Sequence, residues 1–467
     1  MREMQENKMG IMPVNKLIIN MSLPMMISML VQALYNIIDS VFVGMLSEGA
    51  LTAVSLCFPA QNLMIGVATG TGVGINALVS RSLGERNPEK ANSLAKNGVF
   101  LAVLSSIAFL LFGLFGAEIF MRSQTGVEEI VQYGVDYLRV VCCFSFGIYL
   151  EITYERLLQS TGKTMITMCT QGIGAIINII LDPIFIFSSE DSFLGFGLGL
   201  GVMGAAIATV AGQIASAIIA IVLNTKKNKE LNVNFKGFRP DGKLIGQIYK
   251  IGVPSIIMVG IGSIMTYSMN KILITYTPGK ETAATVFGAF FKLNSFIFMP
   301  IFGLNNGVIP IIAYNYGARK KERMLKTIKL AVAYAEFFSL LGVVLFTTIP
   351  ATLLSFFSAS EEMLRIGVPA LRIIGSSFAF AGICVALGAS FQALGKSFYS
   401  MLVSLIRQLF VLTPVAYFLA RYGEKIGNEH LVWFSYPVAE IFSLIVSIVC
   451  FVVVYKKIIS KVDKVEF

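Results

Sequence analysis

The feature that most limits how this chain can fold is a series of long apolar stretches, each at least as long as the roughly 20 residues that cross a lipid bilayer as a helix. Twelve such stretches lie at 17–46, 51–79, 98–121, 135–158, 165–188, 201–224, 251–278, 283–314, 327–349, 367–391, 397–420 and 431–455. Charged residues make up 14% of the chain, compared with about 25% in a soluble domain. The sequence therefore predicts an all-α integral membrane protein with twelve transmembrane helices.

The two halves of the chain resemble each other. The segment LRVVCCFSFGIYLEITYERLLQSTGKTMITM begins at Leu138, and LRIIGSSFAFAGICVALGASFQALGKSFYSM begins at Leu371. A second pair of segments, from Gly72 and Asn305, aligns with the same shift of 233 residues, about half of the chain. A repeat of this length indicates the duplication of one six-helix unit.

The duplication predicts two pseudo-symmetric six-helix lobes, 1–224 and 251–467, joined by a cytoplasmic linker at 225–250. Lys and Arg concentrate in alternate connections, which predicts that those connections and both termini lie in the cytoplasm. The expected location is a bacterial cell membrane. The net charge of +10 follows mainly from this asymmetry. Membrane lipids, and not nucleic acid, are the expected partners of the basic segments. Duplicated bundles around a central site are an architecture of transporters.

Residues for enzymatic chemistry are scarce. His430 is the only histidine, the six cysteines lie in apolar stretches without a CxxC pair, and no GxxxxGK[ST] pattern for ATP occurs. A resident metal or cofactor is therefore not predicted. Transport by this chain would be secondary, or would need another subunit. A membrane-embedded enzyme is the least favoured hypothesis, because such an enzyme needs paired acids, histidines or a nucleophile motif.

Four acidic residues interrupt the apolar stretches of the first half, and the aligned positions of the second half carry no acid. They are Asp39, Glu151, Glu155 and Asp182. A carboxylate within a membrane-spanning helix costs a few kcal/mol, and such residues are usually functional. The two aspartates are the stronger candidates. Glu151 and Glu155 lie toward the predicted cytoplasmic end, where Arg156 could pair with a carboxylate.

Helical spacing places these acids in rows with other polar residues. The rows are Gln32, Asn36 and Asp39, with Tyr35 near the edge; Asn178 and Asp182; and Glu151, Glu155 and Gln159. Residues three or four apart share one face of a helix. Because lipid cannot satisfy polar groups, the rows should point inward and form an acidic cluster inside the N-terminal lobe. Asn and Gln alone could instead bridge helices.

A proline in the first half and two acids in the second half also lead to predictions. Pro24, in the same stretch as Asp39, leaves a backbone carbonyl without its helical partner and makes a natural bending point. In the second half, Glu336 and Glu440 are single acids for which pairing with Arg407 or Lys292 is the expected role.

Several motifs together resemble those of the multidrug and toxic compound extrusion (MATE) transporters. They are Pro24 with Asp39 in the first stretch, GTGVGINALVSRSLGE at the end of the second, LQSTGKT after the fourth, and the pattern NxxLDP in the fifth. The resemblance covers essentially the whole chain. It implies two lobes around a V-shaped cleft and export of lipophilic, often cationic drugs and dyes, a source of antibiotic resistance, in exchange for inward H⁺ or Na⁺.

The resemblance also implies residue roles. In the DinF-like branch of the family, an acid of the first helix and the Asn and Asp of the fifth form the cation site, and these positions match Asp39, Asn178 and Asp182. Gln32 and Tyr35 match cavity positions. The NorM-like branch relies on acids in helices seven and ten, which this chain lacks. Apart from H⁺ or Na⁺ at that site, the resemblance implies no metal or cofactor.

The substrate cavity is thus expected to contain Gln32, Tyr35, Asn36, Glu151 and Glu155, in a protein that acts as a monomer. Glu155 stands where a neutral residue would serve, which favours cationic substrates. The alternative function is a flippase for lipid-linked precursors with a related two-lobe architecture. Such a protein would need a strongly cationic cavity for pyrophosphate, whereas Arg and Lys are few in these stretches.

Overall fold

The computed structural model describes residues 6–190, 195–277, 280–357 and 359–462, and these residues are mostly helical. The first half contains α1 (Lys8–Ile11), α2 (Val14–Leu46), α3 (Glu48–Gly84), α4 (Pro88–Phe115), α5 (Ala117–Gln124), α6 (Glu128–Cys143), α7 (Phe146–Ser160), α8 (Thr164–Ile186) and α9 (Gly201–Lys227). The second contains α10 (Gly242–Tyr276), α11 (Lys280–Gly317), α12 (Lys321–Thr348), α13 (Pro350–Ser355), α14 (Glu361–Ala393), α15 (Ser397–Leu405), the π-helical segment η1 (Ile406–Leu412), α16 (Thr413–Ile426) and α17 (Ser435–Lys457).

The all-α class and the order of the spans are confirmed. Within the described residues, 11 helices or continuous helical runs are long and apolar enough to cross a membrane. The fourth predicted stretch, 135–158, is divided between α6 and α7, which are separated by Phe144 and Ser145. Within the part of the chain described, extended pairing is limited to one isolated bridge between Ser188 and Leu198.

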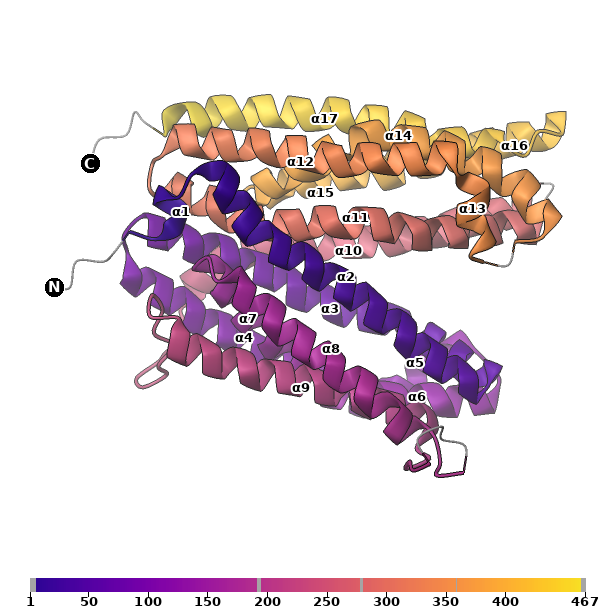
Figure 1. The fold of residues 1–467 in the computed structure, drawn as a ribbon, viewed down its shortest axis with the longest axis horizontal. Coiled ribbons are helices and arrows are strands. Elements are labelled where there is room, and N and C mark those ends of the chain that lie inside the picture. The colour runs from indigo at the N-terminus through magenta and orange to yellow at the C-terminus, as the bar shows by residue number, and fades with distance from the viewer. Residues whose placement is uncertain (1–5, 191–194, 278–279, 358, 463–467) are drawn as a thin grey trace.

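The helices form two bundles, α2–α9 and α10–α17 (Figure 1). The bundles lie close together at the end where the two termini are found, and they diverge toward the opposite end. Helix α2 runs obliquely across the molecule (Figure 1) and packs on both α8 and α11.

The backbone supports the internal duplication. Arg86 and Arg319, which are 233 residues apart, are the two described non-glycine residues with left-handed backbone, at φ 55° and 57°. Each follows the C-terminal end of a long helix, α3 or α11. Gly162 and Gly395 have the same separation and φ values of 82° and 71°. Equivalent turns in the two halves therefore have the same unusual geometry.

The two lobes touch backbone to backbone at equivalent glycines. A Cβ atom on Gly84 would lie 2.0 Å from the main-chain oxygen of Tyr314, and one on Gly317 would lie 2.1 Å from that of Arg81. These two contacts are related by the repeat, since both pairs are displaced by 233 positions. The contact is therefore reciprocal, as across a twofold axis, and only glycine allows the helices to approach so closely.

The N-terminal segment strengthens the same end of the molecule. The Asn7 side chain donates hydrogen bonds to the Thr161 carbonyl of the first lobe, at 3.0 Å, and to Glu230 of the linker, at 2.6 Å. Glu6 forms an ion pair with Lys320 of the second half, and the hydrogen bond from that lysine holds the pKa of Glu6 below its usual value. Residues 6 and 7 thus link the two lobes.

Pro24 lies in α2 at the seam between the lobes. It lacks the N–H that would bond to the Asn20 carbonyl, and that oxygen instead accepts a long hydrogen bond of 3.5 Å from Thr164 Oγ1. Two residues further along α2, Gly303 of α11 is so close that its Cβ would lie 2.5 Å from Met26 Cα. A bend of α2 at Pro24 would therefore disturb the contact with the second lobe.

Candidate functional site

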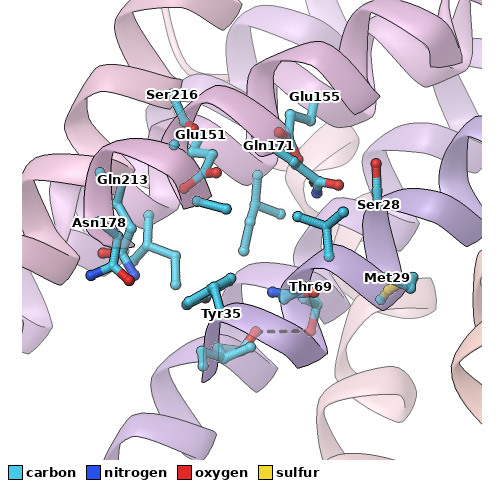
Figure 2. A pocket seen from close by; sticks show the side chains of 18 of the residues that line it. Ser28, Met29, Tyr35, Thr69, Glu151, Glu155, Gln171, Asn178, Gln213 and Ser216 are labelled. Carbon is cyan, nitrogen blue, oxygen red and sulfur yellow. Dashed lines mark hydrogen bonds between the residues drawn. The ribbon is translucent and has the colours of Figure 1, made fainter. Parts of the chain in front are cut away.

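A cavity in the N-terminal lobe gathers polar side chains from α2, α7, α8 and α9 (Figure 2). Six residues of the predicted rows line it: Gln32, Tyr35, Glu151, Glu155, Gln159 and Asn178. The structure therefore brings together the three rows that were separate in the sequence. Asn36 does not line this cavity, because its side chain lies on an exposed part of α2.

The two glutamates line this cavity from the same helix, α7. Both oxygens of Glu155 accept hydrogen bonds, from Thr170 Oγ1 at 3.0 Å and from Gln171 Nε2 at 2.7 Å. Glu151 lies one helical turn earlier on α7, beside Ser216 of α9 (Figure 2). The carboxyl groups of Glu151 and Glu155 are close enough to interact electrostatically. Together they give the cavity an acidic wall.

Arg156 does not pair with a carboxylate through a hydrogen bond, contrary to the expectation from the sequence. Its Nη1 atom donates to two amide oxygens, Oε1 of Gln159 at 2.8 Å and Oδ1 of Asn306 at 2.9 Å. Asn306 belongs to α11, so this guanidinium connects the two lobes. Its charge is held at the boundary of the cavity and leaves both glutamates without a salt bridge among the described residues.

Asp39, Asn178 and Asp182 form a second group beyond the cavity wall. Asn178 Nδ2 donates to Asp182 Oδ1 at 3.3 Å and to Thr209 Oγ1 at 3.4 Å. The carboxylates of Asp39 and Asp182 interact electrostatically. Asp182 is fully buried and Asn178 is 3% exposed. The two helices that carry these residues, α2 and α8, thus place two acids together inside the lobe.

Three oxygen atoms of this group lack a hydrogen-bond partner in the described structure. Asp39 Oδ1, Asn178 Oδ1 and Asp182 Oδ2 are buried and have no hydrogen-bond partner within the described structure. A buried carboxylate oxygen without a partner is costly. A proton on one carboxyl, or a Na⁺ ion among the three oxygens, would remove that cost. A proton or a small cation is the kind of partner that these oxygens lack.

Three polar residues of α9 also line the cavity and were missed by the sequence interpretation: Thr209, Gln213 and Ser216. They are spaced by four and three residues, the same pattern as the row on α2. That spacing could have identified them, because it places all three on one helix face. None of the three is acidic, so a search for charged residues in apolar stretches did not find them.

The acids of the second half have different surroundings. Glu440 of α17 forms an ion pair with Arg407 of η1, with Nη1 and Oε1 3.2 Å apart, which confirms that pairing. Glu336 has a buried oxygen without a partner, and no ion pair to it is found within the described residues. Lys292 instead lies over the ring of Phe357, 5.9 Å from its centroid.

The family model MatE matches the chain over residues 24–184 and 254–418, one match in each half. The multidrug export protein MepA of Staphylococcus haemolyticus is 28% identical over 427 residues, which cover 91% of this chain and 90% of that protein. MepA of Staphylococcus aureus strain MSSA476 is 26% identical over 429 residues, 92% and 91% of the two chains.

Solved structures agree with this similarity over the full length. An outward-facing conformation of a multidrug resistance MATE family transporter of the MOP superfamily superposes with a TM-score of 0.88 at 25% identity, covering all of both chains. A MATE structure in complex with MaL6 gives a TM-score of 0.89 at 25% identity, covering 99% of this chain and 100% of that one.

Proposed function

This chain belongs to the MatE family, the multidrug and toxic compound extrusion (MATE) transporters, and from that premise we propose that it exports lipophilic cations in exchange for inward-moving H⁺ or Na⁺. It is a secondary multidrug efflux transporter and not an enzyme. The proposal includes the working orientation: a monomer in a bacterial cell membrane, with both termini in the cytoplasm and lobes at 1–224 and 251–467 joined by the linker 225–250.

The observation that carries the coupling proposal is the set of unpartnered oxygens on Asp39, Asn178 and Asp182. A buried ionised carboxyl gains more from a cation than an exposed one does, because water does not compete for it. This group lies in one lobe only, so a single cation site is sufficient. The same atoms suit H⁺ or Na⁺, which is why the ion is left to experiment.

Helix α2 connects this site to the contact between the lobes. Asp39 lies 15 residues after Pro24, about 22 Å along the helix axis. Helix α2 packs on α8, whose first residue Thr164 reaches the Asn20 carbonyl, and near Pro24 it also packs on α11 of the second lobe. In the proposed mechanism a cation from outside neutralises Asp39, α2 bends near Pro24, and the substrate leaves outward. The cation leaves to the cytoplasm after the lobes have switched.

The acidic cavity supports a cationic substrate. Its charged lining residues are Glu151, Glu155 and Arg156, and the arginine donates to amide oxygens at the cavity boundary. A lipophilic cation in such a cavity is attracted to the carboxyl groups and packs against the apolar lining. A flippase for pyrophosphate-linked lipids would need the opposite polarity, and this cavity therefore does not favour it.

The direct test is export of ethidium from liposomes that contain the purified protein. Ethidium carries a permanent charge, so a pH gradient alone does not redistribute it. We expect dye efflux under an inward gradient of either H⁺ or Na⁺, each imposed separately, and the effective gradient names the coupling ion. Protein-free liposomes give the leak rate. If neither gradient drives efflux above that rate, the antiport proposal is wrong.

The acidic wall makes a separate prediction about affinity. Because either glutamate alone leaves one carboxyl in the cavity, both are replaced in the variant Glu151→Gln/Glu155→Gln. We expect ethidium binding to weaken about tenfold, the effect of losing an interaction with a charged group. Fluorescence titration of the purified protein measures it.

The matched control replaces Glu118 and Glu129 by glutamine. Glu118 belongs to α5 and Glu129 to α6, and both are exposed and do not line the cavity. This control should bind ethidium as the unmodified protein does. Equal affinities in the two double variants would show that the glutamates do not contribute to cation binding.

A further inference from the structure

The C-terminal lobe contains a second cavity with a different lining. Its walls come from α10, α11, α14, η1 and α17, and they include Phe290, Phe298, Phe302 and Phe378. The rings of Phe298 and Phe378 meet edge to face, with their centroids 5.3 Å apart. Met29 of α2 lines this cavity and also the acidic one in the other lobe. The two cavities therefore adjoin at the same methionine.

An ion pair faces this aromatic cavity. Arg407 and Glu440 both line it, and Nη1 of the arginine lies 3.2 Å from Oε1 of the glutamate. The arginine side chain is 28% exposed, so part of its guanidinium is turned to open space. A guanidinium has five N–H groups, and within the described residues Arg407 makes one side-chain hydrogen bond, to Glu440. Most of its donors are thus available.

Other polar atoms around the pair are also unused. Glu440 Oε2 and the Tyr436 hydroxyl are buried and have no hydrogen-bond partner in the described structure. Both residues are 9% exposed and line the same cavity. A pair that served only to hold α17 against η1 would be expected to satisfy its own atoms. These atoms instead leave an incomplete set of donors and acceptors around one apolar space.

The π-helical segment explains how the arginine reaches the cavity. Pro414 has no N–H to donate, and Thr413 bonds through both its N–H and its Oγ1 to the carbonyl of Gln408, five residues earlier. The wider turn lets the consecutive residues Arg407 and Gln408 both line the cavity. Short π-helical segments are frequent at functional sites because they reorient side chains in this way.

We propose that this cavity is a second binding site, for an aromatic compound that carries both an ammonium and a carboxylate group. The Arg407–Glu440 pair opens, the ligand carboxylate accepts hydrogen bonds from Arg407 and the Tyr436 hydroxyl, and the ligand ammonium donates to Glu440. The aromatic part of the ligand packs on the phenylalanine wall. This inference goes beyond cation export and does not depend on it.

Charge balance selects this class of ligand. The two facing charges of the site cancel, so a ligand of net zero charge adds no uncompensated charge to a poorly hydrated space. A ligand with only a positive charge would be repelled by Arg407, and a ligand with only a negative charge would be repelled by Glu440. A compound with both groups satisfies each side chain, and arginine binds a carboxylate through two parallel hydrogen bonds.

Two fluorescent probes that differ by one carboxylate group test the proposal. Nε-dansyl-lysine carries an ammonium and a carboxylate, and dansylcadaverine is the same molecule without the carboxylate. Binding of each to the purified full-length protein is followed by dansyl fluorescence. We expect Arg407→Gln/Glu440→Gln, which keeps the site neutral, to weaken dansyl-lysine binding about tenfold or more and to leave dansylcadaverine binding unchanged.

The outcomes separate this site from the first one. Asp39→Asn should leave dansyl-lysine binding intact, so failure of the antiport proposal does not affect this result. If the double variant does not fold, as judged by its dansylcadaverine binding, Tyr436→Phe removes one hydroxyl and should weaken dansyl-lysine binding severalfold. The proposal is overturned if the unmodified protein does not bind dansyl-lysine, if neither change weakens that binding, or if Tyr436→Phe weakens the binding of both probes equally.

Discussion

Replacing Asp39 by asparagine is expected to reduce gradient-driven ethidium export to the leak rate of protein-free liposomes. Asparagine has almost the same shape as aspartate, so the packing of α2 on α8 should remain. It cannot take up or release a proton at this site, and it has no charge with which to hold Na⁺. The export assay under the effective gradient measures the loss, and a parallel titration should show that ethidium still binds.

The matched control for this change is Asp136→Asn on α6, in the same lobe. Asp136 accepts a hydrogen bond of 3.0 Å from Gln132 on the exposed side of its helix, away from the cavity. It should export at the rate of the unmodified protein. Normal export by the Asp39→Asn variant would remove Asp39 from the coupling mechanism. Loss in both variants would point to a general effect of removing an acid from this lobe.

The double variant Gly84→Ala/Gly317→Ala is expected to lose most of its export for a different reason. Each new methyl group would lie about 2 Å from a main-chain oxygen of the other lobe, and the backbones must separate to make room. Overpacking of this kind costs about 1–3 kcal/mol, which changes the ratio of two conformations by about 5- to 150-fold. The conformation with these ends in contact should therefore become rare.

Hydrogen exchange can locate this effect. We expect faster exchange in the turns after α3 and α11, where the Asn87 and Lys320 amides each bond to a carbonyl of the preceding helix. The control is Gly172→Ala in α8, where a Cβ would meet no atom within 4 Å. That change should alter neither exchange nor export. Normal export by the double variant would mean that the lobes do not need this close contact.

The sequence was sufficient for the fold because the bilayer restricts a membrane chain so strongly. Apolar length identified the spans, and the repeat identified two equivalent halves. The division of one span into α6 and α7 at Ser145 could not be seen, because hydropathy averaged over a window is the same for a broken and an unbroken helix. The π-helical segment before Pro414 was hidden for a similar reason: the proline signals a disturbed helix but does not say which disturbance results.

The candidate site was only partly predictable. Rows of acids and amides indicated which helix faces point inward, and Tyr35 and Glu151 do line one cavity. The partner of Arg156 was not, since Asn306 lies 150 positions away in the other half. Spacing along one helix cannot reveal a neighbour that only the packing of two lobes supplies. Asn36 does not line the cavity although its neighbours in the row do, because the sequence does not mark where the inward face of a helix ends.

The matching turns at Arg86 and Arg319 have a consequence for the history of this protein. Two copies of one unit that meet at their own equivalent residues have the geometry of a homodimer. An ancestral chain of half the length could have formed this contact with a second molecule of itself, before the two genes were fused through a short linker. In a single chain that holds both copies, each copy can mutate alone. That independence explains how Asp39 can occur in one half and Arg407 in the other.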